Sequence, residues 1–137
     1  MYRLISALIF APALAGAAEI TTLPTESLDW AKTPEGVAFA PLNGDRFSEA
    51  YMAMVSLPHG MISPPHIKTA DMFGIVVSGS MTHVPAGVDP KDGQLLSAGA
   101  FYHVPAGIPH VSSCLSDQDC VTFLYQPGAF DFNVISQ

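Results

Sequence analysis

Imidazole and ammonium side chains carry most of the chemistry available to this sequence. The chain has five histidines among its 137 residues. Imidazoles exchange protons near neutral pH and also bind metal ions, whereas an ammonium group pairs with anions. His66 and Lys68 are two residues apart, so their side chains share one face if this segment is extended. The other histidines are His59, His83, His103 and His110.

The two cysteines, Cys114 and Cys120, are separated by five residues that look like a polar turn between two strands. In an oxidising compartment they are expected to form a disulfide across this turn. The alternative is a metal-binding cysteine pair, which the missing second CxxC motif disfavours. A bridge over so short a loop is expected to act mainly on local structure.

The N-terminus has the three-part form of a secretory signal peptide. Arg3 gives a positive start, residues 4–15 form an apolar run, and Ala15-Gly16-Ala17 matches a cleavage site. We therefore expect residues 1–18 to be a signal peptide and the protein to be exported, to a periplasm or outside the cell. An uncleaved anchor or a buried N-terminal helix is the alternative, although the run is short for a membrane span.

Charge and composition exclude some partners and favour strands. The formal net charge is −7 and no basic patch is present, so nucleic acid and membrane surfaces are not expected partners after signal cleavage. Proline and glycine recur, and turn signals follow one another at intervals close to ten residues. No convincing helical period appears after residue 18. These features predict an all-β barrel or sandwich.

We expect one domain at residues 37–137, preceded by an irregular arm at residues 19–36. The strands that must position the histidines are predicted at residues 37–40, 50–57, 72–77, 81–84, 101–104, 110–115, 120–126 and 130–135.

Two glycine- and histidine-containing stretches make the chain resemble the cupin superfamily. Cupins have a first motif with a glycine, two histidines, a glutamate and a closing glycine, and a second with a glycine, a proline, a glycine and a histidine. In the first stretch, Gly60, His66 and Gly79 match. The second stretch is the more specific one, and it matches at Gly99, Pro105, Gly107 and His110. The resemblance implies a small cupin, or jelly-roll, β-barrel with a ligand pocket inside.

The chain departs from the metal motif of cupins at two positions. Lys68 stands at the second histidine position and Met72 at the glutamate position, so His66 and His110 remain of the usual four ligands. Two imidazoles are too few for a tight transition-metal site. A third ligand would be His103 or His83. The resemblance therefore leaves two cofactor states open, which are no cofactor and a single divalent transition metal.

Two functions remain open on these residues, and a third, a structural or assembly role, remains open without them. The first is binding of a small, anionic organic ligand by the barrel pocket, where Lys68 and the imidazoles form an electropositive cluster that also suits acid–base chemistry. The second is a metal-dependent enzyme, dioxygenase-like or isomerase-like, that uses His66 and His110. Any lone histidine here is more simply a packed, hydrogen-bonded residue. The resemblance also implies pairing into a homodimer. The expected pocket residues are His66, Lys68, Met72, Tyr102, His103 and His110.

Overall fold

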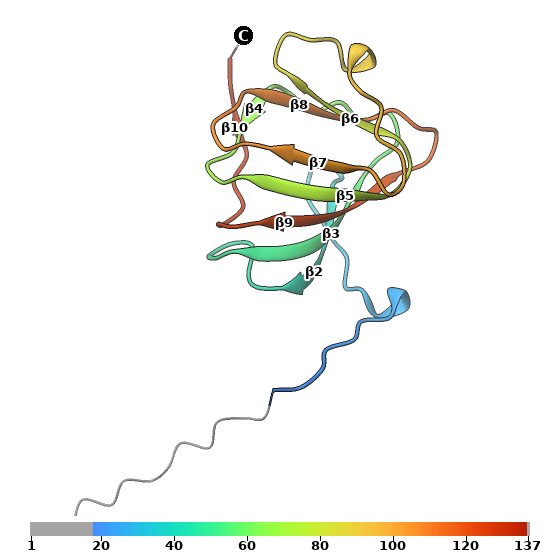
Figure 1. Ribbon diagram of the computed structural model, residues 1–137, viewed down its shortest axis with the longest axis vertical. Helices are drawn as coiled ribbons and strands as arrows, with labels where there is room; N and C mark the ends of the chain where they lie inside the picture. Colours follow the sequence, from blue (N-terminus) through green and yellow to red (C-terminus); the bar gives the residue numbers. More distant parts are fainter. Residues whose placement is uncertain (1–17, 137) are drawn as a thin grey trace, which may run out of the picture.

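The computed structural model describes residues 18–136, so the expected signal peptide lies almost wholly outside the described residues. Two antiparallel sheets face each other across the barrel (Figure 1), which confirms the all-β cupin-like prediction. The first sheet has the order β1 (Ala31–Lys32), β2 (Ala38–Asn43), β3 (Tyr51–Leu57), β9 (Cys120–Gln126), β5 (Met72–Ser78) and β7 (Phe101–Val104). The second has the order β10 (Asn133–Val134), β4 (His66–Ile67), β8 (His110–Cys114) and β6 (Met81–Pro85). Two short 3-10 turns complete the fold, η1 (Thr25–Ser27) and η2 (Pro90–Asp92).

Seven of the eight predicted strands form close to the expected residues, and the eighth is much shorter than expected. The segment predicted as a closing strand at residues 130–135 pairs only through β10. The short strands β1 and β4 were not predicted, because two residues are too few to show an alternating pattern. β4 is nevertheless essential to the site, since it pairs His66 with His110 of β8.

The barrel interior is built by alternation along the long strands. β3 and β9 alternate buried and more exposed residues along their whole length, and they pair in register from Tyr51–Gln126 to Leu57–Cys120. Buried side chains of this first sheet meet those of β6 and β8 between the two sheets. The resulting core includes Phe39, Val55, Leu57, Met72, Val76, Met81, Tyr102, Val104 and Leu124.

Gly74 lets an aromatic ring cross the inner face of the first sheet. It pairs with Tyr102 in the β5–β7 ladder, and a Cβ atom at residue 74 would clash with the Cζ atom of Tyr102. The ring is buried, and its hydroxyl lies 2.9 Å from the Thr122 hydroxyl. Glycine at residue 74 therefore makes room for the Tyr102 ring.

We expect Gly74→Ala to lower the free energy of unfolding by about 1–3 kcal/mol, because the added methyl group must displace a packed ring. The measurement is chemical denaturation of this variant and of Ala53→Gly, which removes a methyl group from a buried residue of β3 instead of adding one. A Gly74→Ala protein as stable as the parent would mean that Tyr102 does not occupy this position.

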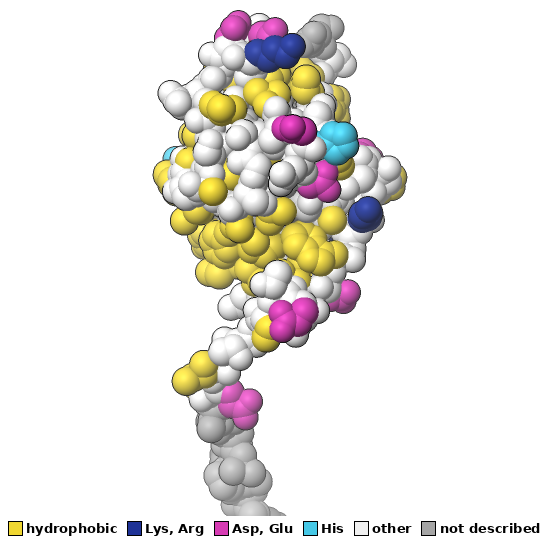
Figure 2. All heavy atoms as spheres, turned by 90° about the vertical axis from the view of Figure 1, so that its right-hand side faces the viewer, with side chains coloured by type: hydrophobic (Ala, Val, Ile, Leu, Met, Phe, Trp, Pro, Cys, Tyr) yellow, Lys and Arg dark blue, Asp and Glu magenta, His cyan; other side chains and the backbone are white. Residues whose placement is uncertain are grey.

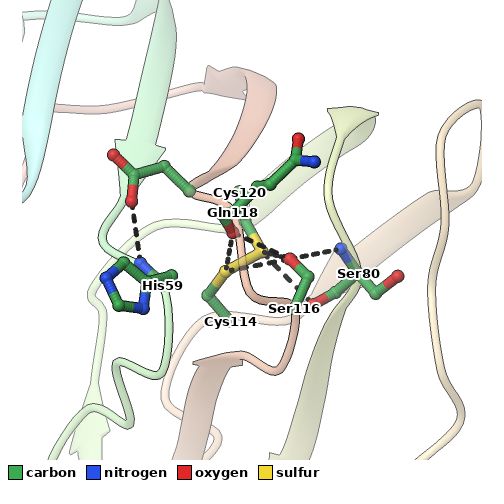
Figure 3. The surroundings of a disulfide bond; sticks show 7 residues. His59, Ser80, Cys114, Ser116, Gln118 and Cys120 are labelled. Atoms are coloured by element: carbon green, nitrogen blue, oxygen red, sulfur yellow. Dashed lines mark hydrogen bonds between the residues drawn. A yellow bond between two sulfur atoms is a disulfide. The ribbon is translucent and has the colours of Figure 1, made fainter.

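The predicted disulfide between Cys114 and Cys120 is present and joins the ends of β8 and β9. Both cysteines are fully buried. Figure 3 shows that Ser116 braces the enclosed turn, because its hydroxyl donates to the Gln118 carbonyl oxygen at 2.8 Å and accepts from the Ser80 amide at 3.2 Å. The bridge therefore fixes the hairpin and ties it to the turn between β5 and β6.

The surface carries apolar area as well as charge. Figure 2 shows hydrophobic side chains gathered on the part of the barrel next to the N-terminal arm. Between residues 18 and 136, no helix has both the length and the apolar character needed to cross a membrane.

Candidate functional site

A cavity of about 470 Å³ opens into the barrel between the two sheets. This volume is in the range of small-molecule sites. Its walls are mostly apolar and come from both sheets and from the C-terminal segment. The apolar lining includes Val37, Phe39, Val55, Leu57, Met61, Met72, Met81, Leu124, Phe130, Phe132 and Val134, and the polar lining includes Thr33, Glu35, Ser63, His66, Lys68, His83, Tyr102, Ser112 and Thr122.

His66 and His110 lie side by side because β4 pairs with β8 at these two residues. Their ring centroids are 4.2 Å apart, and both side chains are almost fully buried. Each Nδ1 lies 2.9 Å from the carbonyl oxygen two residues earlier, of Pro64 and of Ile108 respectively. A carbonyl oxygen only accepts, so each Nδ1 carries a proton and each neutral ring presents an unprotonated Nε2.

His83 is a third imidazole in the interior, on β6. Its Nδ1 lies 2.9 Å from the Ser112 hydroxyl, and its ring packs against the Tyr102 ring at 4.2 Å. Within residues 18–136, the Nε2 atoms of His83 and His110 are buried and have no hydrogen-bond partner. A buried polar atom without a partner is costly, so the His83 Nε2, on the cavity wall, would gain from a hydrogen bond with a ligand.

Burial keeps all three imidazoles neutral at pH 7. The pKa of His66 is lowered from 6.5 to about 4, mainly by burial and to a smaller extent by His110 and Lys68, whereas the hydrogen bond to Pro64 and the charge of Asp131 oppose this effect. Burial lowers the pKa of His83 to about 3, with smaller contributions from His110 and His66. The pKa of His110 is also lowered, mainly by burial. The histidines therefore act as neutral hydrogen-bonding groups, not as cations.

Lys68 supplies the positive charge on the cavity wall and is itself buried, with 6% of its surface exposed. Its Nζ atom donates a hydrogen bond to the Asp131 carbonyl oxygen at 2.7 Å and lies 4.0 Å from the centre of the Phe130 ring. Over the described part of the chain, no carboxylate pairs with it within 4.0 Å. Burial lowers its pKa from 10.5 to about 8, and the charge of Asp131 opposes this effect.

The turn of the second cupin motif holds the Lys68 segment in place. The Gly107 amide donates to the Lys68 carbonyl oxygen at 2.8 Å, and Gly107 adopts a φ of 74°, which favours glycine. The Ala106 amide donates to an Asp71 carboxylate oxygen at 2.8 Å. The turn therefore holds this segment at Lys68 and at Asp71, which directly precedes Met72.

Sequence reasoning missed the C-terminal segment of the site. Phe130 and Phe132 line the cavity, and the Phe132 ring stacks on the His66 ring with centroids 4.1 Å apart. Asp131 provides the only hydrogen bond found for the Lys68 Nζ atom among residues 18–136. The aromatic residues at alternate positions were visible in the sequence, but the cupin motifs end upstream of them.

The structure brings together most of the predicted pocket residues. His66, Lys68, Met72 and Tyr102 line the cavity, and so does His83, which was considered only as a metal ligand. His110 contacts the His66 ring but is not among the lining side chains.

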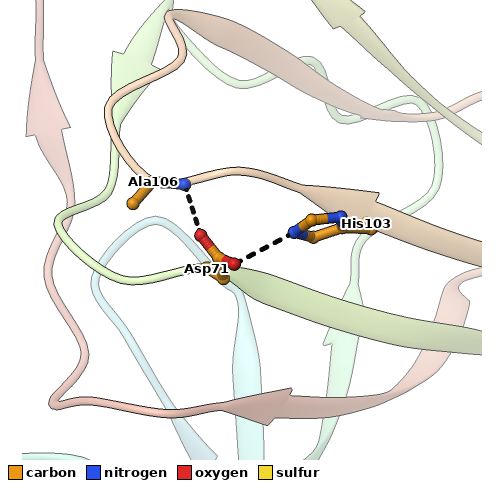
Figure 4. A network of polar contacts seen from close by, with 3 residues as sticks. All are labelled: Asp71, His103 and Ala106. Atoms are coloured by element: carbon orange, nitrogen blue, oxygen red, sulfur yellow. Dashed lines mark hydrogen bonds and ion pairs between the residues drawn. The ribbon is translucent and has the colours of Figure 1, made fainter.

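The prediction that His103 faces the pocket is wrong. Along β7 the residues alternate, so Tyr102 and Val104 point inward and His103 points outward. The His103 ring stacks on Phe73 with centroids 4.4 Å apart, and its Nε2 lies 3.2 Å from the Asp71 carboxylate (Figure 4). The same carboxylate faces the turn at Ala106, so neither residue reaches the cavity.

The donor set does not fit the metal site that cupins usually carry. Lys68 and Met72 replace two of the four usual ligands, and His103 lies outside. Nowhere in residues 18–136 do three His, Cys, Asp or Glu side chains form a group that could hold one metal ion. A buried ammonium on the same wall would also repel a cation.

Comparisons with known proteins agree with this architecture. No curated protein matches the chain. The fold is similar to KdgF from Halomonas sp., with a TM-score of 0.62 and 20% identity over 78% of this chain and 94% of that one. It is also similar to the polyketide cyclase RemF from Streptomyces resistomycificus, with a TM-score of 0.67 and 17% identity over 87% and 88% of the two chains. An acetylacetone dioxygenase from Acinetobacter johnsonii gives a TM-score of 0.63 and 15% identity over 95% and 86%.

Sequence identities of this size establish a shared fold, and they do not assign the activity of any of these proteins to this chain. The model of the ChrR cupin-like domain family matches residues 18–129, which is most of the sequence. The match includes both cupin motifs and the whole cavity wall except Phe130, Phe132 and Val134. The chain therefore belongs to the ChrR cupin-like domain family of cupins.

Proposed function

We propose that the barrel cavity binds a small organic molecule with an apolar body and one anionic group, which lies against Lys68. The observation that carries the proposal is a buried ammonium group with no carboxylate partner on the wall of an otherwise mostly apolar cavity. Burying a charge is costly unless it is paired, so an anionic ligand group would stabilise the Lys68 ammonium by pairing with it. The exposed Glu35 at the lining disfavours a second anionic group there.

The imidazoles add a preference to this binding site. His66 presents an unprotonated Nε2 and accepts a hydrogen bond, so a ligand hydroxyl beside the anionic group would satisfy it. The proposal also places the protein outside the cytoplasm, in a periplasm or beyond the cell. The buried disulfide and the signal-like N-terminus support that location.

The first test compares octanoate with octanamide, which share an apolar chain and differ in charge. At pH 7, octanoate is expected to bind at least about tenfold more tightly, because a hydrogen-bonded charge pair contributes more than a neutral hydrogen bond. Isothermal titration calorimetry on the purified full chain measures both affinities.

Two variants locate the effect. Lys68→Met is expected to bind octanoate and octanamide about equally. Lys91→Met, the same substitution at an exposed lysine, is expected to retain the parent's preference. If the parent binds both compounds equally, or Lys68→Met still prefers octanoate, the proposed function is wrong.

A further inference from the structure

The contacts of the Lys68 Nζ atom within the protein do not use its full bonding capacity. Nζ uses one hydrogen bond, to the Asp131 carbonyl oxygen, and rests against the Phe130 ring. The side chain is buried yet lines the cavity, so a molecule inside the barrel contacts the Lys68 side chain. The Asp131 carboxylate is occupied elsewhere, because it accepts from the Thr69 amide at 3.1 Å and from the Asn133 side chain at 2.6 Å. The amine is therefore presented to a ligand without being masked by a carboxylate.

We infer that the Lys68 amine condenses reversibly with the carbonyl group of a small apolar aldehyde or ketone bound in this cavity. The inference rests on the proposed function in one respect, which is that it uses the same ligand cavity. It does not require the ligand to carry an anionic group. A desolvated lysine in an apolar pocket is a recognised arrangement for forming imines.

The protonation state of Lys68 agrees with this geometry. A free amine is the nucleophile, and an ordinary lysine is almost wholly protonated at neutral pH. Burial lowers the pKa of Lys68 to about 8. About a quarter of the side chains are then unprotonated at pH 7.5. Asp131 and the neutral histidines are the other titratable groups near Lys68, and Asp131 alone favours the ammonium form.

The reaction balances without an oxidant or a reductant. The Nζ lone pair forms a bond to the carbonyl carbon, the carbonyl electron pair moves to oxygen, and oxygen takes up a proton to give a carbinolamine. The nitrogen then loses a proton, the hydroxyl oxygen takes up a second proton, and the carbon–oxygen bond breaks to release water as the nitrogen lone pair forms the carbon–nitrogen double bond. Loss of the remaining proton from nitrogen gives the imine. His66 lines the same cavity with an unprotonated Nε2, so it is placed to accept a hydrogen bond from the carbinolamine hydroxyl. The products are the imine and one water molecule.

The test treats the full chain with benzaldehyde and sodium cyanoborohydride at pH 7.5, and peptide mapping follows reductive labelling of each lysine. Lys68 is expected to be labelled at least about tenfold faster than an ordinary exposed lysine, because more of it is unprotonated. The exposed residues Lys32 and Lys91 are the comparators within the same sample. Octanoate is expected to slow labelling at Lys68 and to leave the comparators unchanged.

Lys68→Arg provides a variant that keeps a positive charge and cannot form an imine. Its adduct at residue 68 is expected to be lost, with circular dichroism as the check on folding. If Lys68 in the parent is labelled no faster than Lys32 and Lys91, the inference is overturned, a result that does not depend on any variant folding. Rapid labelling of Lys68 in a protein that does not prefer octanoate over octanamide would support the inference while the proposed function failed.

Discussion

Replacing Lys68 with methionine is expected to make the ligand-free protein more stable at pH 7, by about 1–3 kcal/mol. Burial lowers the Lys68 pKa from 10.5 to about 8, so the folded state disfavours the ammonium form that the unfolded chain carries. A difference of that size corresponds to about 3 kcal/mol at a pH below both values. Methionine fills a similar volume and retains the contact with the Phe130 ring. The lost hydrogen bond to the Asp131 carbonyl oxygen offsets about 1 kcal/mol of the gain.

The pH dependence of the gain separates this cause from better packing. Above pH 8 the folded protein releases the Lys68 proton while the unfolded chain still holds it, so the stability of the parent rises with pH toward 10.5. The advantage of Lys68→Met should therefore shrink over that range. Urea denaturation at pH 7 and pH 9.5 measures it, with Lys91→Met as the matched surface substitution. A Lys68→Met variant less stable than the parent at pH 7 would contradict a buried, unpaired ammonium.

A gain in stability at Lys68 combined with a loss of octanoate binding would identify the lysine as a functional residue. Residues selected for folding alone do not oppose stability in this way, whereas ligand sites often do. The contrast with Arg46 is informative, because its guanidinium lies over the Phe39 and Phe47 rings at 4.4 and 4.1 Å and is only partly buried. Arg46 also keeps contact with water, whereas Lys68 is buried with one hydrogen bond, and under the proposed function an anionic ligand group pairs with it.

The sequence predicted the barrel well because strand signals are local. Alternation along residues 50–57 and 120–126 and the turn residues between strands were enough to place β3 and β9. The disulfide followed from the polar insert between Cys114 and Cys120. The cupin resemblance predicted that His66 and His110 meet from across the barrel, whereas they lie on adjacent strands, because β4 is too short to be recognised in the sequence.

The prediction failed where the outcome depends on which face a residue takes or on a distant segment. His103 is on the expected strand, but a one-residue step along β7 puts Tyr102 inside and His103 outside. His83 lines the cavity because β6 pairs with β8, a relation that no motif residue indicates. The contacts of Lys68 with Phe130 and Asp131 join residues more than sixty positions apart, as in the hydrogen bond to the Asp131 carbonyl oxygen at a separation of 63. Only the three-dimensional structure reveals such contacts.

Mild acid is expected to unfold the protein, because the buried histidines resist protonation. The unfolded chain takes up protons at its histidines as the pH falls below 6.5, whereas folded His66 and His83 do so only near pH 4 and pH 3. The unfolded state therefore binds more protons in this range, and stability falls as the pH falls. Each such histidine contributes a slope of about 1.4 kcal/mol per pH unit, so these two together cost about 6 kcal/mol between pH 6.5 and pH 4. A loss of that size is comparable to the whole stability of a typical domain.

The imidazoles can be distinguished from the carboxylates by the pH at which stability is lost. The pKa values of Asp71 and Asp131 are lowered below 3.8, so these carboxylates reduce stability only below about pH 4. Lys68 is protonated in both the folded and the unfolded state between pH 6.5 and pH 4. Thermal unfolding measured from pH 6.5 to pH 4.5 should therefore show a falling melting temperature that the histidines cause. His83→Gln removes one of these groups and keeps a hydrogen-bonding side chain beside Ser112, so its stability should fall less steeply over the same range. A parent whose stability is constant from pH 6.5 to pH 4.5 would show that water and protons reach the imidazoles freely, and the cavity would then not hold them in the neutral state that the proposed ligand site requires.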